Sequence, residues 1–555
     1  MIKLNKFLTK IIIFLILIFL ISFIYFSYFS EVYQLYYFFE NSLWLWDTIK
    51  KLSFIFFLLN TIIISNNISN KICNLLFKPQ IINCKNTTNA ANLCLYVGDT
   101  LDGENIIVPE SGLYQNFLIT GSIGSGKTSS AMYPYTKQLI SYNSLNFNKK
   151  LGMLILDVKG NYYSKVLDFA KESNRLDDII VIQIGGPYFY NPLDKPNLKP
   201  SVLANHLKTI LLLFSPNNSE SYWIDKAESA ICEAIKLCRI YNKNYVTFTE
   251  LHKLITSREY YCEKTKYLHE EFLKNNLSKQ QIYDLLSCLN FFEKEFFSLD
   301  DRTFNILKSE ITRITNYFIS DYEISKTFCP PKEDLNFNGF YDVIQSGKIV
   351  VLNINISKYK NLSKIISAYL KLDFQTEVLN RLSNSNYCDR PVAFISDEYS
   401  EYVTATDSTF FSQSREAKCI NIVSTQSYTS ILNSLNNKYS AEVIIQNLVN
   451  KIWFRSDDFY TIESAQKQFG KFDREIISHS FSENAKQTNY NFFTNSFNSK
   501  DSNIAESIST SSHFDYKYDS NFFTQSLETF STLSFLSNGK NIFYTGNLKM
   551  NPYFK

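Results

Sequence analysis

One stretch, "FLITGSIGSGKTSSAMYPY" from residue 117 to 135, constrains the fold more than any other part of the chain. Four strand-forming residues lead into a glycine-rich turn, and a helical pattern follows a Lys-Thr pair. The spacing from Gly121 to Gly126-Lys127-Thr128 fits GxxxxGK[ST], in which glycines let backbone N–H groups converge on phosphate oxygens without side-chain clash. The N-terminus of the next helix adds its positive end. The stretch therefore predicts a strand, a phosphate-binding loop and a helix.

Two side chains of this loop carry specific chemistry. Lys127 can reach the β- and γ-phosphates of a nucleotide, and the Thr128 hydroxyl can ligate Mg²⁺. ATP with Mg²⁺ is the expected ligand, and the alternative is a glycine-rich structural turn. The expected nucleotide-binding residues are Gly121, Ser122, Gly124, Ser125, Gly126, Lys127, Thr128 and Ser129.

A second motif supplies the acids that hydrolysis requires. In "PVAFISDEY", Asp397 and Glu398 stand at the end of an apolar run, where a strand is expected to end. Asp397 is the predicted holder of the Mg²⁺ shell, and Glu398 is the residue expected to orient or deprotonate the attacking water. The alternative is that two acids merely terminate a strand.

Two later residues complete the expected catalytic set. Gln426, in "NIVSTQS", ends the next apolar run and could sense the γ-phosphate. Arg415, in "SQSREAK", lies between the two motifs, and an arginine that stabilises charge on a transferred phosphoryl group can come from a neighbouring subunit. Alternatively, Gln426 is an ordinary amide at a strand end and Arg415 a solvated surface residue. The predicted catalytic residues are thus Lys127, Glu398, Arg415 and Gln426.

Beyond residue 110, short apolar runs alternate with helical stretches. Continuous apolar strands interleaved with helices predict an α/β fold with a mainly parallel sheet covered on both faces. The runs begin at residues 116, 151, 178, 348, 391, 419, 450 and 541. One region lacks them: residues 201–340 show helical spacing, as in "WIDKAESAICEAIKLCRIY" from Trp223, and predict an inserted all-helical subdomain. Residues 481–521 are rich in Ser, Asn and Thr and are expected to form a long flexible loop.

The first 84 residues are predicted to be a membrane anchor. Residues 11–30, "IIIFLILIFLISFIYFSYFS", contain no charge and are long enough to cross a hydrocarbon core of about 30 Å. A second, weaker candidate span covers residues 52–70. Lysines before the first span and after the second predict that both ends are cytoplasmic. The rest of the chain is then a cytosolic body.

The charge balance bears on the partner. The chain has 56 Lys and Arg against 53 Asp and Glu, so its net charge is only +3. A dedicated nucleic-acid binder usually shows a basic footprint, so a DNA partner has to be inferred from other features. The 10 cysteines form no CxxC pair, which argues against a metal framework.

Together these motifs resemble the type IV secretion coupling proteins, the TraG-like membrane-anchored ATPases of conjugation and secretion. The resemblance includes a proline after the P-loop lysine, here Pro134, which is expected to end or kink the helix just before it. "ILDVKGNYY", with Asp157, Lys159 and Gly160, matches a strand ending in Asp-x-Lys-Gly in that family. "YNPLD" at residues 190–194, "SDE", "SREAK" and "STQS" follow in the expected order.

The resemblance implies a RecA-like motor domain, residues 85–200 and 341–555, that assembles into a hexamer at the inner membrane. Each site would use Arg415 from the next subunit. The implied partners are single-stranded DNA with its relaxase, or effector proteins, and the components of the type IV secretion channel. The all-helical subdomain would take part in substrate selection.

Two other functions remain open. A DNA pump of the FtsK/HerA type shares the motor but not "YNPLD" or the helical insertion. A nucleotide-gated membrane adaptor for protein cargo would not touch DNA, and the near-neutral charge is compatible with it because phosphate neutralisation dominates DNA affinity.

Overall fold

The computed structural model describes residues 92–157, 159–214, 221–337, 339–384, 388–483, 488–492, 496–499 and 504–554. The chain divides into two compact units, Met1–Asn83 and Cys84–Lys555, and all described residues belong to the second. The membrane anchor predicted for residues 1–84, with its spans at 11–30 and 52–70, therefore lies outside the described residues. Within the described ranges, no helix is both long and apolar enough to span a membrane.

The central element is an eleven-stranded sheet with the order β2-β1-β15-β14-β9-β3-β8-β7-β4-β6-β5. The seven strands from β9 to β5 pair in parallel, and the other four pair antiparallel along one edge. This mixed, mainly parallel sheet with helices confirms the predicted α/β class. The parallel strands are β3 (Phe117–Thr120), β4 (Gly152–Leu156), β5 (Ile179–Ile182), β6 (Ile349–Leu352), β7 (Val392–Ser396), β8 (Cys419–Thr425) and β9 (Asn450–Trp453). The antiparallel strands are β1 (Cys94–Thr100), β2 (Asn105–Pro109), β14 (Ser531–Ser537) and β15 (Ile542–Lys549).

Two apolar cores lie on opposite faces of the sheet. Phe117 and Ile119 belong to one core and Leu118 to the other, as the alternation of side chains along a strand requires. One face packs against α4 (Tyr133–Ser141) and α5 (Tyr162–Glu172), and the other against α15 (Asn361–Asn380), α17 (Tyr428–Leu435) and α18 (Lys438–Asn447). Burial on both faces explains why these strands are continuous apolar runs.

Between β5 and β6 the described residues form helices and no strand. The helices are α6 (Pro200–Leu213), α7 (Ser221–Tyr241), α8 (Phe248–Thr256), α9 (Arg258–Leu273), α10 (Lys279–Phe291), α11 (Asp301–Ile319), α12 (Tyr322–Phe328) and α13 (Phe340–Ser346). A capping box marks the start of α10. The Ser278 hydroxyl accepts from the Gln281 N–H, and the Gln281 side chain accepts from the Ser278 N–H. Many of their apolar faces join the core on one side of the sheet.

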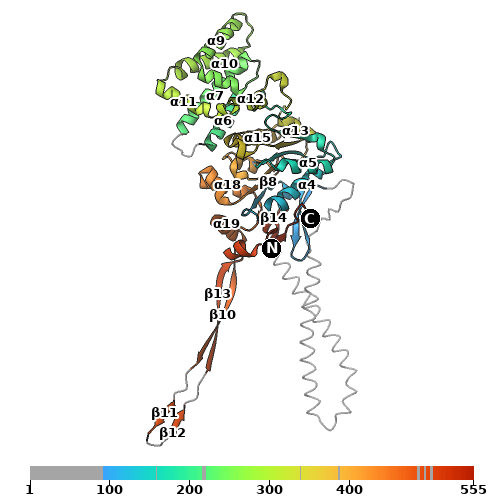
Figure 1. The fold of residues 1–555 in the computed structure, drawn as a ribbon, viewed down its shortest axis with the longest axis vertical. Coiled ribbons are helices and arrows are strands. Elements are labelled where there is room, and N and C mark those ends of the chain that lie inside the picture. The colour runs from blue at the N-terminus through green and yellow to red at the C-terminus, as the bar shows by residue number, and fades with distance from the viewer. Residues whose placement is uncertain are drawn as a thin grey trace. The chain divides into compact units, whose positions relative to one another are not determined.

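The segment expected to be a loop at residues 481–521 is mostly strand. β10 (Lys471–Glu483) and β13 (Ile504–Tyr516) pair in an unbroken antiparallel register from Lys471↔Tyr516 to Glu483↔Ile504 (Figure 1). β11 (Thr488–Asn491) pairs with β12 (Ser496–Ser499). The loop prediction was wrong because it weighed composition alone. Ser and Thr alternate here with β-branched and aromatic residues, and that period of two is the pattern of a strand.

Candidate active site

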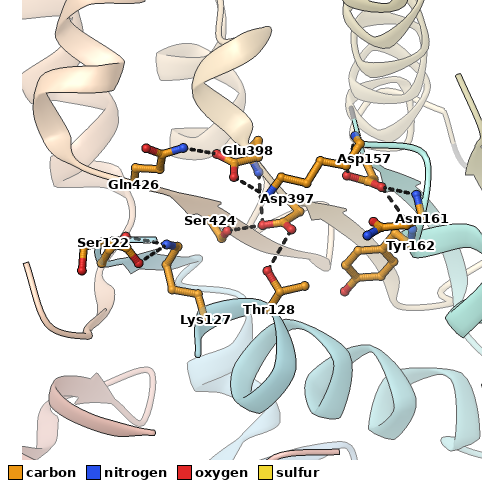
Figure 2. A network of polar contacts seen from close by, with 12 residues as sticks. Ser122, Lys127, Thr128, Asp157, Asn161, Tyr162, Asp397, Glu398, Ser424 and Gln426 are labelled. Carbon is orange, nitrogen blue, oxygen red and sulfur yellow. Dashed lines mark hydrogen bonds and ion pairs between the residues drawn. The ribbon is translucent and has the colours of Figure 1, made fainter. Parts of the chain in front are cut away.

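The carboxyl ends of four neighbouring strands, in the order β3-β8-β7-β4, meet at one edge of the sheet. The glycine-rich loop follows β3, Gln426 follows β8, Asp397 follows β7 and Asp157 follows β4. Ligands of open parallel sheets bind outside the carboxyl ends of the strands. The sheet therefore brings together residues that are far apart in the sequence, such as Ser122 and Gln426 (Figure 2).

The glycine-rich loop has a backbone that only glycine adopts easily. Gly124 and Gly126 have φ of +77° and +100°, which are conformations that L side chains rarely adopt. An added Cβ at Gly126 would also lie 2.6 Å from the Phe530 ring. The Ser122 N–H and hydroxyl both donate to the Arg455 carbonyl, at 2.7 and 3.1 Å, and the Ser125 hydroxyl donates to the Ser122 carbonyl at 2.8 Å. The loop is thus held by a hydrogen bond within itself and by hydrogen bonds to Arg455, which follows β9.

Lys127 folds back over this loop. Its ammonium donates to the Gly121 carbonyl and, at 3.1 Å, to the Ser122 carbonyl (Figure 2). Burial lowers the pKa of Lys127, and the charges of Glu398 and Asp397 oppose that shift. The lysine and the two predicted acids therefore lie close enough to influence one another electrostatically.

The helix after the loop starts with a π-helical turn, Thr128–Met132, and becomes α-helical in α4. Pro134 lies in the first turn of α4, where its missing N–H is tolerated. The change of helix type falls just before Pro134, but the helix neither ends nor breaks there. Of the two expected outcomes, an ended or a kinked helix, the ended helix was wrong, because a wide turn precedes the proline and accommodates it. A π-helical turn just before the proline is one of the places where helices kink.

Asp397 is buried and both of its carboxylate oxygens accept hydroxyl hydrogen bonds. Thr128 donates to Oδ2 at 3.1 Å and Ser424 to Oδ1 at 2.5 Å (Figure 2). Burial raises the pKa of Asp397, whereas the Ser424 hydrogen bond and the charge of Lys159 lower it. The carboxylate and the Thr128 hydroxyl form an oxygen donor pair of the kind that Mg²⁺ prefers. Among the described residues, no group of three or more His, Cys, Asp or Glu is placed to hold a metal ion. Magnesium at phosphate sites commonly uses one or two carboxylates together with phosphate oxygens and water.

Glu398 sits in a strained backbone conformation beside that carboxylate. Its φ is +52°, in the left-handed region that non-glycine residues rarely occupy. One carboxylate oxygen pairs with the Lys159 ammonium at 2.6 Å, and the other accepts from the Gln426 amide at 3.5 Å. Strain of this kind concentrates at functional sites, where the surrounding structure holds it in place.

The sequence motifs gave no role to Asp157 or Lys159, yet both belong to the site. Asp157 is buried, and its carboxylate accepts the backbone N–H groups of Lys159, Asn161 and Tyr162 at 2.9 to 3.1 Å. It therefore fixes the β4–α5 loop that carries Lys159. The signal that could have identified them was the same as for Asp397: charged residues directly after an apolar strand.

Arg415 does not lie with the other predicted catalytic residues. It precedes β8, which runs parallel to β3 with Phe117 opposite Ile422, so it lies at the amino edge of the sheet. Its side chain is exposed, and its guanidinium donates to the Gly539 carbonyl at 3.3 Å. The chain does not bring Arg415 to its own glycine-rich loop.

A C-terminal clamp, which no sequence motif predicted, also contacts the loop. We use this name for Phe530, Met550 and Tyr553. The Phe530 N–H donates to the Ser125 carbonyl at 3.3 Å, the Tyr553 N–H to the Ser129 carbonyl at 3.0 Å, and the Met550 N–H to the Phe530 carbonyl at 2.7 Å. These residues flank β14 and β15, so the antiparallel edge of the sheet supports the loop from outside.

The comparisons with known proteins bear on the fold. No family model and no curated protein matches the sequence. The unbound bacterial conjugative coupling protein TrwB, lacking its first 70 residues, aligns over 82% of this chain and 88% of its own, with TM-score 0.53 and 11% identity. TrwB with ADP and Mg²⁺ aligns over 82% of this chain and 89% of its own, with TM-score 0.53 and 12% identity. TrwB with the ATP analogue ADPNP aligns over 82% of this chain and 90% of its own, with TM-score 0.52 and 10% identity. The chain therefore has the fold of a conjugative coupling protein, which confirms at the level of fold the resemblance that the motifs predicted.

Proposed function

We propose that this chain is an ATPase of the conjugation and type IV secretion machinery that binds ATP with Mg²⁺ and hydrolyses it. One observation carries the proposal: Lys127, Thr128, Asp397, Glu398 and Gln426 converge at the carboxyl ends of neighbouring strands. Solved TrwB structures contain ADP with Mg²⁺, the ATP analogue ADPNP and the GTP analogue GDPNP. The same fold with these residues supports the same ligand class here.

Each residue has a part in this proposal. The residues Gly121, Ser122, Gly124, Ser125, Gly126, Lys127, Thr128 and Ser129 enclose the phosphates. The N–H groups of Gly121, Ser122 and Ser125 keep the loop in shape, because they donate to the carbonyls of Gln426, Arg455 and Ser122, and the N–H groups of the other five face the phosphate oxygens. The Lys127 ammonium exchanges its loop carbonyls for β- and γ-phosphate oxygens. Mg²⁺, when bound, would supply positive charge that neutralises charge developing on the phosphates. Thr128 and Asp397 hold its coordination shell, Glu398 orients and deprotonates water, and Gln426 contacts the γ-phosphate.

The position of Arg415 supports an oligomeric enzyme. An exposed arginine at the amino edge of the sheet cannot serve the site at the carboxyl edge of the same chain, but it can serve a neighbour in a head-to-tail ring. We propose a homohexamer in which Arg415 of each subunit stabilises the phosphoryl charge at the next site. Residues 1–84 would anchor the ring in the inner membrane, with spans near 11–30 and 52–70.

The proposed substrate is single-stranded DNA with its relaxase, or effector proteins, handed to a type IV secretion channel. Residues 201–340 would select it. A protein-only adaptor is the second candidate, and the net charge of +3 favours it because DNA affinity depends on phosphate neutralisation. A DNA pump outside secretion shares the motor, so the turnover assay described next does not separate it from the first proposal.

The test is ATP turnover by the purified full-length protein, with and without single-stranded DNA. The Lys127→Ala variant measures background, because it lacks the ammonium that contacts phosphate. Turnover above this background supports the ATPase, and stimulation by DNA supports a DNA substrate over the adaptor. Wild-type turnover equal to that of Lys127→Ala would refute the proposal.

A further inference from the structure

We infer that Lys159 distinguishes ATP from ADP: it holds Glu398 before nucleotide binds and transfers to the γ-phosphate when ATP arrives. The inference rests on the proposed function and adds a residue to it. Its basis is the 2.6 Å ion pair between Lys159 and Glu398, the residue proposed to activate water.

The backbone of Lys159 is fixed from two sides. The Asp157 carboxylate accepts its N–H at 2.9 Å, and its carbonyl accepts from the Asn355 amide at 2.9 Å. Gly160, at φ +75°, places the chain so close to Asn355 that an added Cβ would lie 3.1 Å from the Asn355 Cβ. Lys159 therefore projects from an anchored loop, and its direction is set by the fold.

The Lys159 side chain is far less enclosed than its backbone. It is 50% exposed, whereas the Glu398 side chain is 12% exposed. An ion pair with one exposed partner is held weakly, because water competes for the ammonium. A lysine on a flexible stem can thus exchange one anionic oxygen for another without disturbing the core.

The ion pair of Lys159 lies beside the residues proposed to contact the γ-phosphate: Gln426 donates to the other oxygen of Glu398 at 3.5 Å, and the Gln426 carbonyl accepts from the Gly121 N–H at 3.2 Å. Its charge lowers the pKa of Lys127, and the charges of Asp397 and Asp157 raise its own pKa, although burial opposes them. It therefore lies within electrostatic reach of both the loop lysine and the acid pair. A γ-phosphate between Lys127 and Glu398 would repel the glutamate and attract Lys159. ADP lacks the γ-phosphate and would leave the ion pair intact.

This exchange would couple the recognition of ATP to the activation of water by Glu398. While Lys159 holds Glu398, one carboxylate oxygen is occupied by the ammonium and the other accepts from the Gln426 amide, so neither faces water alone. Transfer of Lys159 to the γ-phosphate frees Glu398 for water and adds a second positive charge to the phosphoryl group. Only ATP would trigger both changes.

The experiment measures the affinities of the full-length protein for ADP and for the analogue ADPNP, both with Mg²⁺, together with ATP turnover. The variants are Lys159→Ala, Lys159→Arg and, as a matched control, Lys137→Ala. Lys137 forms a 2.6 Å ion pair with Glu172 on the protein surface and has no role in the proposed chemistry. Retained ADP affinity shows that a variant has folded.

Lys159→Ala is expected to weaken ADPNP binding about ten-fold, as for the loss of one charge-assisted hydrogen bond, and to leave ADP binding within about two-fold. Turnover should also fall, and Lys159→Arg should recover part of both losses. Equal effects on ADP and ADPNP, or none, would overturn the inference while turnover by the wild type upheld the ATPase. A wild type that binds and hydrolyses no ATP would overturn the proposed function and this inference with it.

Discussion

The Thr128 hydroxyl lies 3.1 Å from Asp397 Oδ2, which joins the glycine-rich loop after β3 to the end of β7. The two strands are not neighbours, because β8 lies between them. Ser424, at the end of β8, donates to the other oxygen of Asp397 at 2.5 Å and closes the link. The Asp397 carboxylate is therefore oriented by two hydroxyl groups, one from the segment after β3 and one from β8.

Asp397→Asn should weaken Mg²⁺ binding without unfolding the protein. Asparagine has the same shape and can keep hydrogen bonds to Thr128 and Ser424, but it removes the negative charge that attracts the cation's coordination shell. The Mg²⁺ concentration for half-maximal turnover should rise about 10- to 100-fold, as it does when partners of metal ligands are lost. A titration of turnover against Mg²⁺ checks this, and an unchanged midpoint would remove Asp397 from the metal site.

Glu398→Gln should trap ATP. The amide keeps the size of the side chain but cannot accept a proton from water, so turnover should fall by about 10² to 10⁴, the usual contribution of a general base. Binding of ATP should persist. The matched control is Glu401→Gln, because Glu401 pairs with Lys364 at 2.6 Å nearby and has no assigned role. Normal hydrolysis by Glu398→Gln would mean that another group activates water.

Gly126→Ala should destabilise the loop and abolish nucleotide binding. The new Cβ would meet the Phe530 ring at 2.6 Å, and alanine is strained at φ +100°. Thermal unfolding and ADP affinity measure the two effects. Combining the change with Phe530→Ala should recover part of the stability but not all, because the backbone strain remains. Full recovery would show that the clash alone mattered.

A buried lysine outside the site should give the protein a specific pH dependence. Burial lowers the pKa of Lys451, on β9, to about 8. Between about pH 8 and 10.5 the unfolded state holds the proton and the folded state does not, so the stability contributed by this residue rises with pH in that window and is lowest below it. The whole difference is about 3 kcal/mol.

Lys451→Met should therefore stabilise the protein at pH 7 and lose this advantage near pH 10. The difference in unfolding free energy between variant and wild type isolates Lys451 from tyrosines and cysteines that titrate in the same range. A difference that stays constant from pH 7 to 10 would mean that the Lys451 ammonium is solvated in the folded state.

The sequence allowed prediction of the parts of the site that follow single apolar strands. Lys127, Asp397 and Gln426 could be found because carboxyl ends of parallel strands share an edge of the sheet. The pairing of Lys159 with Glu398 could not, because it depends on β4 lying next to β7, and strand order is not written in local patterns. The C-terminal clamp was hidden for the same reason: Tyr553 reaches Ser129 only through the antiparallel edge of the sheet.

Arg415→Ala tests the proposed assembly. Its hydrogen bond to the Gly539 carbonyl is a minor surface contact, so the variant should fold and bind nucleotide. Turnover should nevertheless fall by about 10³ or more if the guanidinium stabilises the phosphoryl charge at a neighbour's site. Lys418→Ala is the control, because Lys418 precedes the same strand and pairs only with the exposed Asp389 at 2.5 Å.

Mixing subunits makes this prediction decisive. An Arg415→Ala subunit keeps an intact Lys127, and a Lys127→Ala subunit keeps an intact Arg415, so some interfaces in a mixed ring would contain both. Turnover should reappear on mixing two inactive proteins. It should not reappear when Arg415→Ala is mixed with the double variant Lys127→Ala/Arg415→Ala, which offers no arginine. If turnover does not reappear in the first mixture, Arg415 does not act on a neighbour's site. It cannot act on its own site either, because the strand order keeps it at the opposite edge of the sheet, so this result would remove Arg415 from catalysis.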